Sequence, residues 1–285
     1  MKLITLVLLG VSAMLAAIVF LLVCLPSQRQ ARETTSVASP EDSSLVVSLT
    51  TIPSRIKNLP RILRYIRSEL PSAPIVVNIP HTLKRLKQTY DESKVCGLQG
   101  VVPHLIINRV EDIGPITKLL PTLQHPVGKA AQAILVVDDD EVFQRGWFRK
   151  LVRLWKRSKD PSTTVAMPFE RTKYWKQLSK NVGRQVKTIA GFVGYIVPTA
   201  LLTQTAQAQM QTGSTIEDCR FSDDFVISSV LANDLRFSLI VGKQQLSAKT
   251  DVDNHIDALH HLQDHKQKYV QCDKKLRKLI VKRRT

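Results

Sequence analysis

The middle of the chain reads Ala133-Ile134-Leu135-Val136-Val137-Asp138-Asp139-Asp140-Glu141, five apolar residues followed by four acidic ones. The apolar run has the length and β-branched content of a buried strand, which we predict to end at Val137. Four carboxylates there repel one another and lose solvation, so a cation or hydrogen-bond donors must compensate them. Mg²⁺ and Mn²⁺ take oxygen ligands and commonly bridge carboxylates to a diphosphate. An acidic turn or a helix N-terminus is the alternative, but three consecutive Asp residues favour a metal-diphosphate site.

Similar apolar runs occur on the N-terminal side of this segment. They are Leu45–Leu49, Ile75–Ile79 and His104–Ile107. Apolar residues at helical spacing follow the first run between Ile56 and Leu70, and others follow the acidic segment between Trp147 and Trp155. Strands that alternate with helices indicate an α/β fold with a largely parallel sheet. Ligands of such sheets gather at the carboxyl ends of the strands.

Three further motifs carry polar residues into this framework. In Asp112–Lys118, Gly114 permits close backbone approach, and the amides that follow Pro115, with Lys118, offer contacts to a phosphate. An ordinary helix start explains this segment equally well. Ser222-Asp223-Asp224 opens an apolar-periodic segment, where the carboxylates either cap a helix or stand beside a catalytic cleft. Residues 191–194 indicate a tight glycine turn.

The order of these motifs resembles that of GT-A glycosyltransferases. The segments concerned are Val47–Arg55, Asp112–Lys118, Val136–Asp140, Gly191–Gly194 and Asp223-Asp224, and the resemblance covers roughly Leu45–Leu235. It implies a Rossmann-like, mostly parallel sheet flanked by helices. It also implies a metal-dependent enzyme that uses a nucleotide sugar.

The resemblance assigns a role to each matching position. The Asp triplet resembles the DXD motif, in which Asp140 and Asp138 would hold Mn²⁺ or Mg²⁺. The donor would contact Thr51, Arg55, Gly114, Lys118, Asp138 and Asp139. The Asp223-Asp224 pair resembles the acids that supply the base in inverting members, with Asp224 as the stronger candidate. A C-terminal histidine often completes the metal site in this family, but no histidine here matches one clear motif.

The expected reaction is therefore the transfer of a monosaccharide, as in hexosyltransferases, from a nucleoside diphosphate sugar to a hydroxyl acceptor. The acceptor class, whether glycan, protein or lipid, stays open. Two other functions are compatible with the sequence. One is a catalytically inactive, membrane-anchored carbohydrate-binding protein of the same fold. The other is a basic peripheral protein that binds anionic lipid or nucleic acid.

The N-terminus predicts a membrane anchor. Leu3–Leu25 is almost wholly apolar and long enough to cross a bilayer as a helix, whereas a cleaved secretory signal would have a shorter apolar core. We divide the chain into a signal-anchor (1–25), a flexible polar stem (26–44), a GT-A domain (45–272) and a basic tail (273–285). The flanking charges do not orient the span. The enzyme class places the domain in the lumen of the Golgi or the endoplasmic reticulum.

Charge and cysteine content argue against nucleic-acid binding and against zinc or redox chemistry. The formal net charge is +17, but no nucleic-acid-binding module is recognisable, so a solvated tail and helix faces explain the charge and nucleic acid is not an expected partner. One of the four cysteines, Cys24, lies in the predicted span. The others, Cys96, Cys219 and Cys272, allow one disulfide and one free thiol in an oxidising lumen, with the pair left open. No CxxC spacing indicates zinc or redox chemistry.

Overall fold

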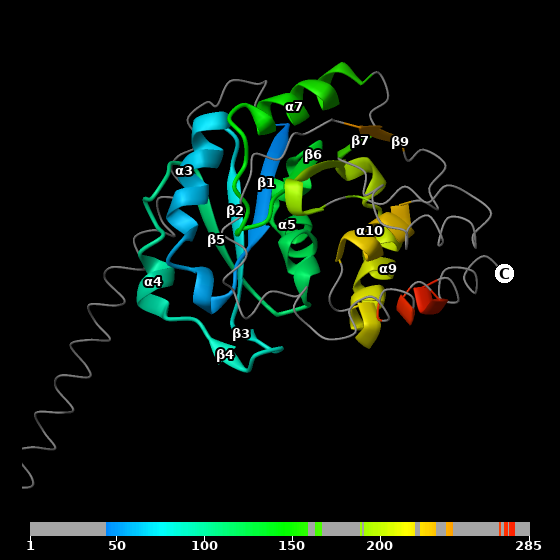
Figure 1. The fold of residues 1–285 in the computed structure, drawn as a ribbon, viewed down its shortest axis with the longest axis horizontal. Helices are drawn as coiled ribbons and strands as arrows, with labels where there is room; N and C mark the ends of the chain where they lie inside the picture. Colours follow the sequence, from blue (N-terminus) through cyan, green and yellow to red (C-terminus); the bar gives the residue numbers. More distant parts are fainter. Residues whose placement is uncertain are drawn as a thin grey trace, which may run out of the picture. The chain divides into compact units, whose positions relative to one another are not determined.

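The computed structural model is built on a seven-stranded sheet in the order β5-β2-β1-β6-β8-β7-β9 (Figure 1). The structure describes residues 44–158, 163–166, 189, 191–219, 223–231, 238–241, 268, 271–272 and 274–276. The predicted span Leu3–Leu25, the stem up to residue 43 and the tail beyond residue 276 lie outside these residues. Within the described part, no helix has both the length and the apolar character that crossing a membrane requires.

The strands of the sheet run β1 (Leu45–Thr50), β2 (Ile75–Pro80), β5 (Leu105–Val110), β6 (Ala133–Val136), β7 (Thr163–Ala166), β8 (Tyr195–Pro198) and β9 (Ser238–Val241). A separate antiparallel pair joins β3 (Thr82–Leu83) to β4 (Gln88–Thr89). The α-helices are α3 (Leu59–Glu69), α4 (Glu92–Cys96), α5 (Leu120–Gln124), α6 (Pro126–Ala130), α7 (Trp147–Arg157), α9 (Gln204–Thr215) and α10 (Asp223–Leu231). The 3-10 turns are η1 (Pro53–Arg55), η2 (Pro115–Lys118), η3 (Gly191–Val193), η4 (Thr199–Leu201) and η5 (Glu217–Cys219).

The sheet is mostly parallel, which confirms the predicted α/β architecture. β1 pairs in parallel with both β2 and β6, β2 with β5, and β7 with β9, whereas β8 runs antiparallel to β6 and β7. Val47 of β1 lies opposite Ile75 of β2 and Leu135 of β6. Because these parallel strands are in register, the residues that follow β1 and β6 emerge at one edge of the sheet.

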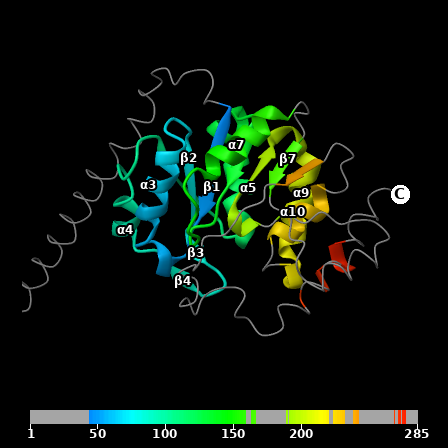
Figure 2. The same cartoon turned by 45° about the horizontal axis from the view of Figure 1, so that its top comes forward.

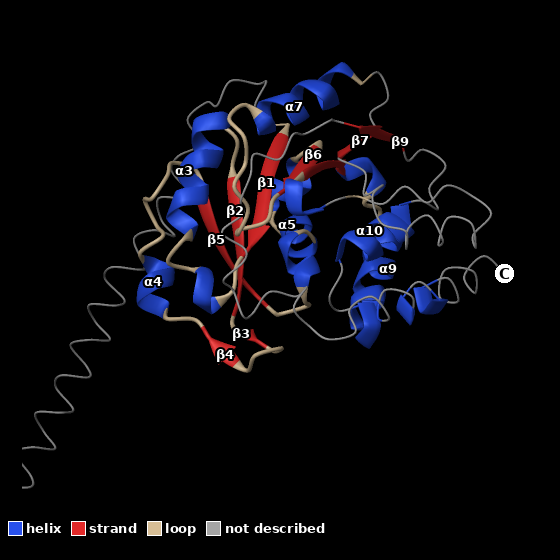
Figure 3. Cartoon of the chain, in the orientation of Figure 1, coloured by secondary structure: helices blue, strands red, loops and turns tan. Residues whose placement is uncertain are grey.

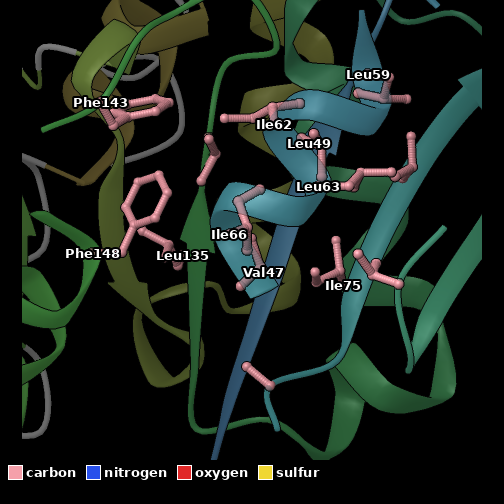
Figure 4. Packing of buried hydrophobic residues seen from close by; sticks show 14 of the residues in the cluster. Val47, Leu49, Leu59, Ile62, Leu63, Ile66, Ile75, Leu135, Phe143 and Phe148 are labelled. Carbon is pink, nitrogen blue, oxygen red and sulfur yellow. The ribbon is translucent and has the colours of Figure 1, made fainter. Parts of the chain in front are cut away.

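Two layers of helices cover the sheet (Figure 3). α3 and α7 pack on one face, where side chains from both helices meet alternate residues of β1, β2 and β6. Figure 4 shows this cluster, with Ile62, Leu63 and Ile66 of α3 beside Val47 and Leu49. The turn η2 and the helices α5, α9 and α10 contribute to the second cluster, on the other face. In Figures 1 and 2, α3 lies beside β1 and β2, and α9 and α10 lie beside the β7 side of the sheet. β1, β2 and β6 are buried along nearly their whole length, as continuous apolar strands require.

A disulfide attaches a C-terminal segment to this second layer. Cys219 pairs with Cys272, and Lys275 Nζ lies 2.5 Å from Asp218 Oδ2. Leu276 is buried against the same cluster, so packed residues extend beyond Cys272, the predicted domain end. The sequence left this pairing open. We expected one free thiol among Cys96, Cys219 and Cys272, and this expectation is wrong, because Cys96 is not a free cysteine.

Candidate active site

The ends of β1 and β6 bring together the first group of predicted site residues. Thr51 Oγ1 donates a 2.6 Å hydrogen bond to Asp139 Oδ2. The guanidinium of Arg55 places Nη1 3.0 Å from Asp139 Oδ1 and 2.7 Å from Asp140 Oδ2. The parallel register of β1 and β6 explains the meeting, because both segments leave the same edge of the sheet. Residues predicted to contact the nucleotide therefore touch residues predicted to hold the metal and the donor.

Lys118 connects this group to the second acidic pair. Its Nζ lies 2.6 Å from Asp138 Oδ1 and 3.0 Å from Asp223 Oδ2. The Lys118 and Asp223 side chains are each only 6% exposed, while that of Asp138 is 25% exposed. The predicted contact of Lys118 with a diphosphate stays a prediction, because this structure engages the ammonium with two carboxylates.

The glycine turn at residues 191–194 positions the carboxylate of Asp224. The backbone N–H of Gly191 donates a 2.9 Å hydrogen bond to Asp224 Oδ2. A Cβ at position 191 would stand 1.9 Å from Asp224 Oδ1, so the carboxylate requires glycine there. Gly194 has φ = 79°, a conformation that favours glycine. Asp224 keeps some exposure, whereas its neighbour Asp223 is buried.

Gly114 lies ahead of η2, and its amide is already engaged. Its N–H donates to Asp112 Oδ1 at 2.8 Å, and Asp112 Oδ2 accepts from the backbone N–H of Lys84 at 2.7 Å. Gly114 itself has φ = 78° and ψ = −161°, which a side chain would oppose. The segment thus shapes the approach to Lys118, and donor binding at Gly114 stays a prediction.

A clamp from α3, which the sequence interpretation missed, holds the acidic segment at its far end. Glu69 Oε1 accepts from Gly146 N at 2.9 Å and from Arg149 Nη2 at 3.1 Å. The hydroxyl of Tyr65 donates to the carbonyl of Gln144 at 2.5 Å. Glu69 is buried although it is acidic. Its position three residues after Ile66, on the apolar face of the helix, was the signal available in the sequence.

Tyr195, also missed, adds a buried hydroxyl to this region. It begins β8 opposite Val136, and its oxygen has no hydrogen-bond partner among the described residues. Burial, and then the charge of Asp223, raise the pKa of Tyr195 well above its ordinary value. Tyrosine in an apolar strand is usual for a core residue, so the sequence held no signal for this placement.

The acidic residues carry more negative charge than their neighbours neutralise. Burial raises the pKa of Asp140 to about 7, with further contributions from Asp139 and Asp138. Burial and the charge of Asp140 likewise raise the pKa of Glu141 to about 7. Burial, followed by repulsion from Asp223, raises the pKa of Asp224 well above its ordinary value. Burial lowers the pKa of Lys118, but the pairing with Asp138 and Asp223 outweighs this and raises that pKa well above its ordinary value.

These carboxylates fit a divalent cation in chemistry but are not arranged as a finished site. Among the described residues, no group of three or more His, Cys, Asp and Glu side chains is placed to hold a metal ion. Arg55 and Lys118 contact the three Asp residues instead. Asp140 and Glu141 nevertheless offer carboxylate oxygens, which are the ligands that Mg²⁺ and Mn²⁺ select, and burial followed by repulsion from neighbouring Asp residues raises the pKa of both groups.

Comparison with known proteins gives structural resemblances only. No protein-family model matches the sequence, and no curated protein matches it. Glucosyl-3-phosphoglycerate synthase from Mycobacterium tuberculosis, crystallised with Mn²⁺, uridine diphosphate and phosphoglyceric acid, is 10% identical, with 82% of this chain and 78% of that chain covered and a TM-score of 0.48. A mannosyltransferase from Pyrobaculum calidifontis, in complex with GDP-Man and Mn²⁺, is 17% identical over 82% of this chain and 66% of that chain, at a TM-score of 0.45. Since these TM-scores are below 0.5, a function for this chain must rest on its own residues.

Proposed function

We propose that the protein transfers a monosaccharide from a nucleoside diphosphate sugar to a hydroxyl acceptor, with a divalent metal and inversion at the sugar carbon. The observation that carries the proposal is the convergence of separate segments on one buried polar centre. Arg55 follows β1, Lys118 ends η2, Asp138–Asp140 follows β6, and Asp223-Asp224 opens α10. Buried charges that only partly neutralise one another do not by themselves stabilise the folded state. Their concentration at this site therefore favours a catalytic or binding role.

On the donor side, Asp140 and Asp138 would hold Mn²⁺ or Mg²⁺. The bound metal supplies a Lewis acid that stabilises negative charge on a leaving diphosphate. Asp140 suits this position because its side chain keeps 18% exposure. Arg55 is the cation nearest to it and can contact the diphosphate bidentately. Thr51 fixes Asp139, which orients the segment towards the donor.

On the acceptor side, Asp224 would take the proton of the attacking hydroxyl. Asp223 is less suited to this step, because it is buried and its charge is paired with Lys118. The amide of Gly191 orients one oxygen of Asp224, and the other has no hydrogen-bond partner within the described part of the chain. A pKa raised by burial makes Asp224 a stronger base than an ordinary carboxylate once it is deprotonated.

We also propose that Leu3–Leu25 anchors the protein in the membrane as a type II protein, with the catalytic domain in the lumen of the Golgi or endoplasmic reticulum. The length and apolar character of the segment support this proposal. Alkaline extraction of membranes tests the anchor, and protease protection in sealed vesicles tests the orientation.

The proposed reaction is tested by a screen of UDP- and GDP-sugars for hydrolysis by the purified full chain, with and without Mn²⁺. We expect metal-dependent hydrolysis of one donor. Asp140→Ala should remove it and weaken the Mn²⁺-dependent binding of UDP or GDP in calorimetric titration, because the variant lacks a proposed metal ligand.

The matched control is Glu111→Ala, which removes an exposed carboxylate whose partner, Lys84, is also exposed. This variant should behave as wild type. The proposal fails if no donor is hydrolysed or bound, and the metal assignment fails if folded Asp140→Ala keeps the affinity of the wild-type protein.

A further inference from the structure

Lys118 is held in place through its backbone. The hydroxyl of Ser48, in β1, donates to the carbonyl oxygen of Lys118. That hydroxyl also lies 2.6 Å from Thr122 Oγ1, which in turn accepts a 2.7 Å hydrogen bond from Asn78 Nδ2 in β2. A buried polar network therefore connects η2 and α5 to the neighbouring strands β1 and β2. Such networks give a unique position to the residues that they bond.

The side chain of Lys118 is held just as closely. Its ammonium joins Asp138, at the end of β6, to Asp223, at the start of α10, over 2.6 and 3.0 Å. Asp223 Oδ2 makes no hydrogen bond to the residues that the structure describes. Among these residues, its charge is compensated by the ion pair with Lys118. Without the ammonium, two carboxylates from different elements would face each other with their charges uncompensated.

A contact between Lys118 and a diphosphate would disturb this arrangement. The side chain is 6% exposed, and the ammonium would have to leave a carboxylate that is itself 6% exposed. Arg55 is also paired with two carboxylates, Asp139 and Asp140, but its side chain is 12% exposed, so it is the more accessible of the two cations.

We propose that Lys118 is a positioning residue, which holds the donor-side Asp138 and the acceptor-side pair Asp223-Asp224 at a fixed separation, and that it does not bind the diphosphate. The assignment of Asp138 to the donor and of Asp223-Asp224 to the acceptor rests on the proposed function, whereas the ion pairs of Lys118 do not depend on it. Reacting groups must be placed to a fraction of an ångström, and a displacement of about 1 Å can lower a rate by about 10²-fold. Lys118 acts on the reaction through the two carboxylates that it joins.

The first test is a double-mutant cycle on the unfolding equilibrium of the metal-free full chain in detergent, with Lys118→Met and Asp223→Asn. Lys118→Met should raise the unfolding constant by roughly 10² to 10³-fold, because it leaves buried carboxylates unpaired. In the Asp223→Asn background the same substitution should have an effect at least about tenfold smaller. If Lys118→Met alone does not fold, recovery of a folded protein in the double variant is the expected result. Absence of such rescue overturns the pairing.

The matched control is an exposed pair, Lys84 Nζ and Glu111 Oε2, 3.4 Å apart with both side chains more than half exposed. The cycle of Lys84→Met and Glu111→Gln should show a coupling below about fivefold, since exposed ion pairs contribute little. An equal coupling in the two cycles would mean that burial of the Lys118 pair has no special consequence, and would overturn the inference.

The second test separates positioning from diphosphate binding. We compare Lys118→Met with wild type or, where that variant is unstable, the double variant with Asp223→Asn. In either comparison the Mn²⁺-dependent Kd for UDP or GDP should change by less than about threefold. The kcat for donor hydrolysis should fall by about 10²-fold with little change in donor KM. A loss of nucleotide affinity of tenfold or more would assign Lys118 to the diphosphate and overturn the inference. If wild type binds no nucleotide, the proposed function fails, whereas the double-mutant cycle still decides the pairing.

Discussion

At the scale of single residues, neighbouring carboxylates have different environments. Asp223 is buried and paired with Lys118, whereas Asp224 is only half-buried and is oriented by the amide of Gly191. Helical spacing did not separate their roles, because both residues begin the same helix and stand above apolar positions. The difference comes from what surrounds α10, namely η2 on one side and the glycine turn on the other.

We expect Asp224→Asn to lower hydrolysis of the donor by about 10² to 10⁴-fold with metal and nucleotide binding preserved, because the amide keeps the shape of the side chain but accepts no proton. Steady-state kinetics together with calorimetric titration measure the two quantities. Normal hydrolysis by Asp224→Asn with loss in Asp223→Asn would reverse the assignment. Normal hydrolysis by both variants would exclude the inverting mechanism proposed here.

At the scale of elements, the segment between β6 and α7 is the most informative. It begins with the acidic residues and ends at Gly146, whose amide is bound by Glu69 of α3. Phe143 packs against the rings of Tyr65 and Phe148, which also pack against each other, and this fixes the segment further. The acidic residues are thus held close together by contacts outside the acidic cluster, which explains how their mutual repulsion is tolerated.

This arrangement predicts a pH dependence of stability. Asp140 and Glu141 have a pKa of about 7 in the folded protein, against ordinary values of 3.8 and 4.5. Between about pH 4 and 7 the folded metal-free protein therefore binds more protons than the unfolded chain, and its stability falls as the pH rises through that range. Metal binding displaces these protons, so metal affinity should rise over the same range.

Thermal unfolding of the metal-free protein at pH 5 and at pH 7.5 measures this effect. Glu141→Gln should reduce the loss of Tm between the two pH values, because it removes one of the carboxyl groups whose pKa is raised in the folded protein and leaves the other carboxylates in place. Equal losses in wild type and variant would contradict the assignment of the pH dependence to this segment.

At the scale of the whole molecule, the disulfide joins segments that are far apart in the chain. Cys219 and Cys272 are separated by 53 residues. Cys219 ends η5, shortly before the start of α10. Leu276 lies against Gly213 of α9 and belongs to the same apolar cluster as Val226 of α10. The C-terminal segment therefore supports the helix that carries the candidate base.

We expect the double substitution of Cys219 and Cys272 by serine to lower the free energy of unfolding by about 2–4 kcal/mol, because a loop of this length loses much of its entropy when closed. Urea unfolding in the absence of reductant measures the change. Hydrogen exchange should increase first in α9 and α10 and least in β1 and β2. Unchanged stability, or an increase spread evenly over the sheet, would contradict this role.

Much of the framework could be predicted from the sequence, since it depends on local patterns. The apolar runs that form β1, β2 and β6 indicated buried parallel strands, and their order placed the acidic residues at a ligand-binding edge. The acidic pair at Asp223-Asp224 was also visible as a motif. The role of Tyr195 was not visible, because tyrosine is usual in a buried strand, and the apolar-face position of Glu69 signalled burial without identifying its partners.

Local sequence patterns were sufficient for the mostly parallel α/β framework and for the types of residue available for chemistry, because hydrophobic periodicity and charged motifs act over a few neighbouring residues. The partner of each charged or reactive side chain was settled by packing in three dimensions. That packing placed Arg55 on Asp139 and Asp140, Lys118 between Asp138 and Asp223, Gly191 against Asp224, and Cys219 on Cys272. Such pairings depend on how strands and helices distant in sequence pack together, and no local pattern contains that information.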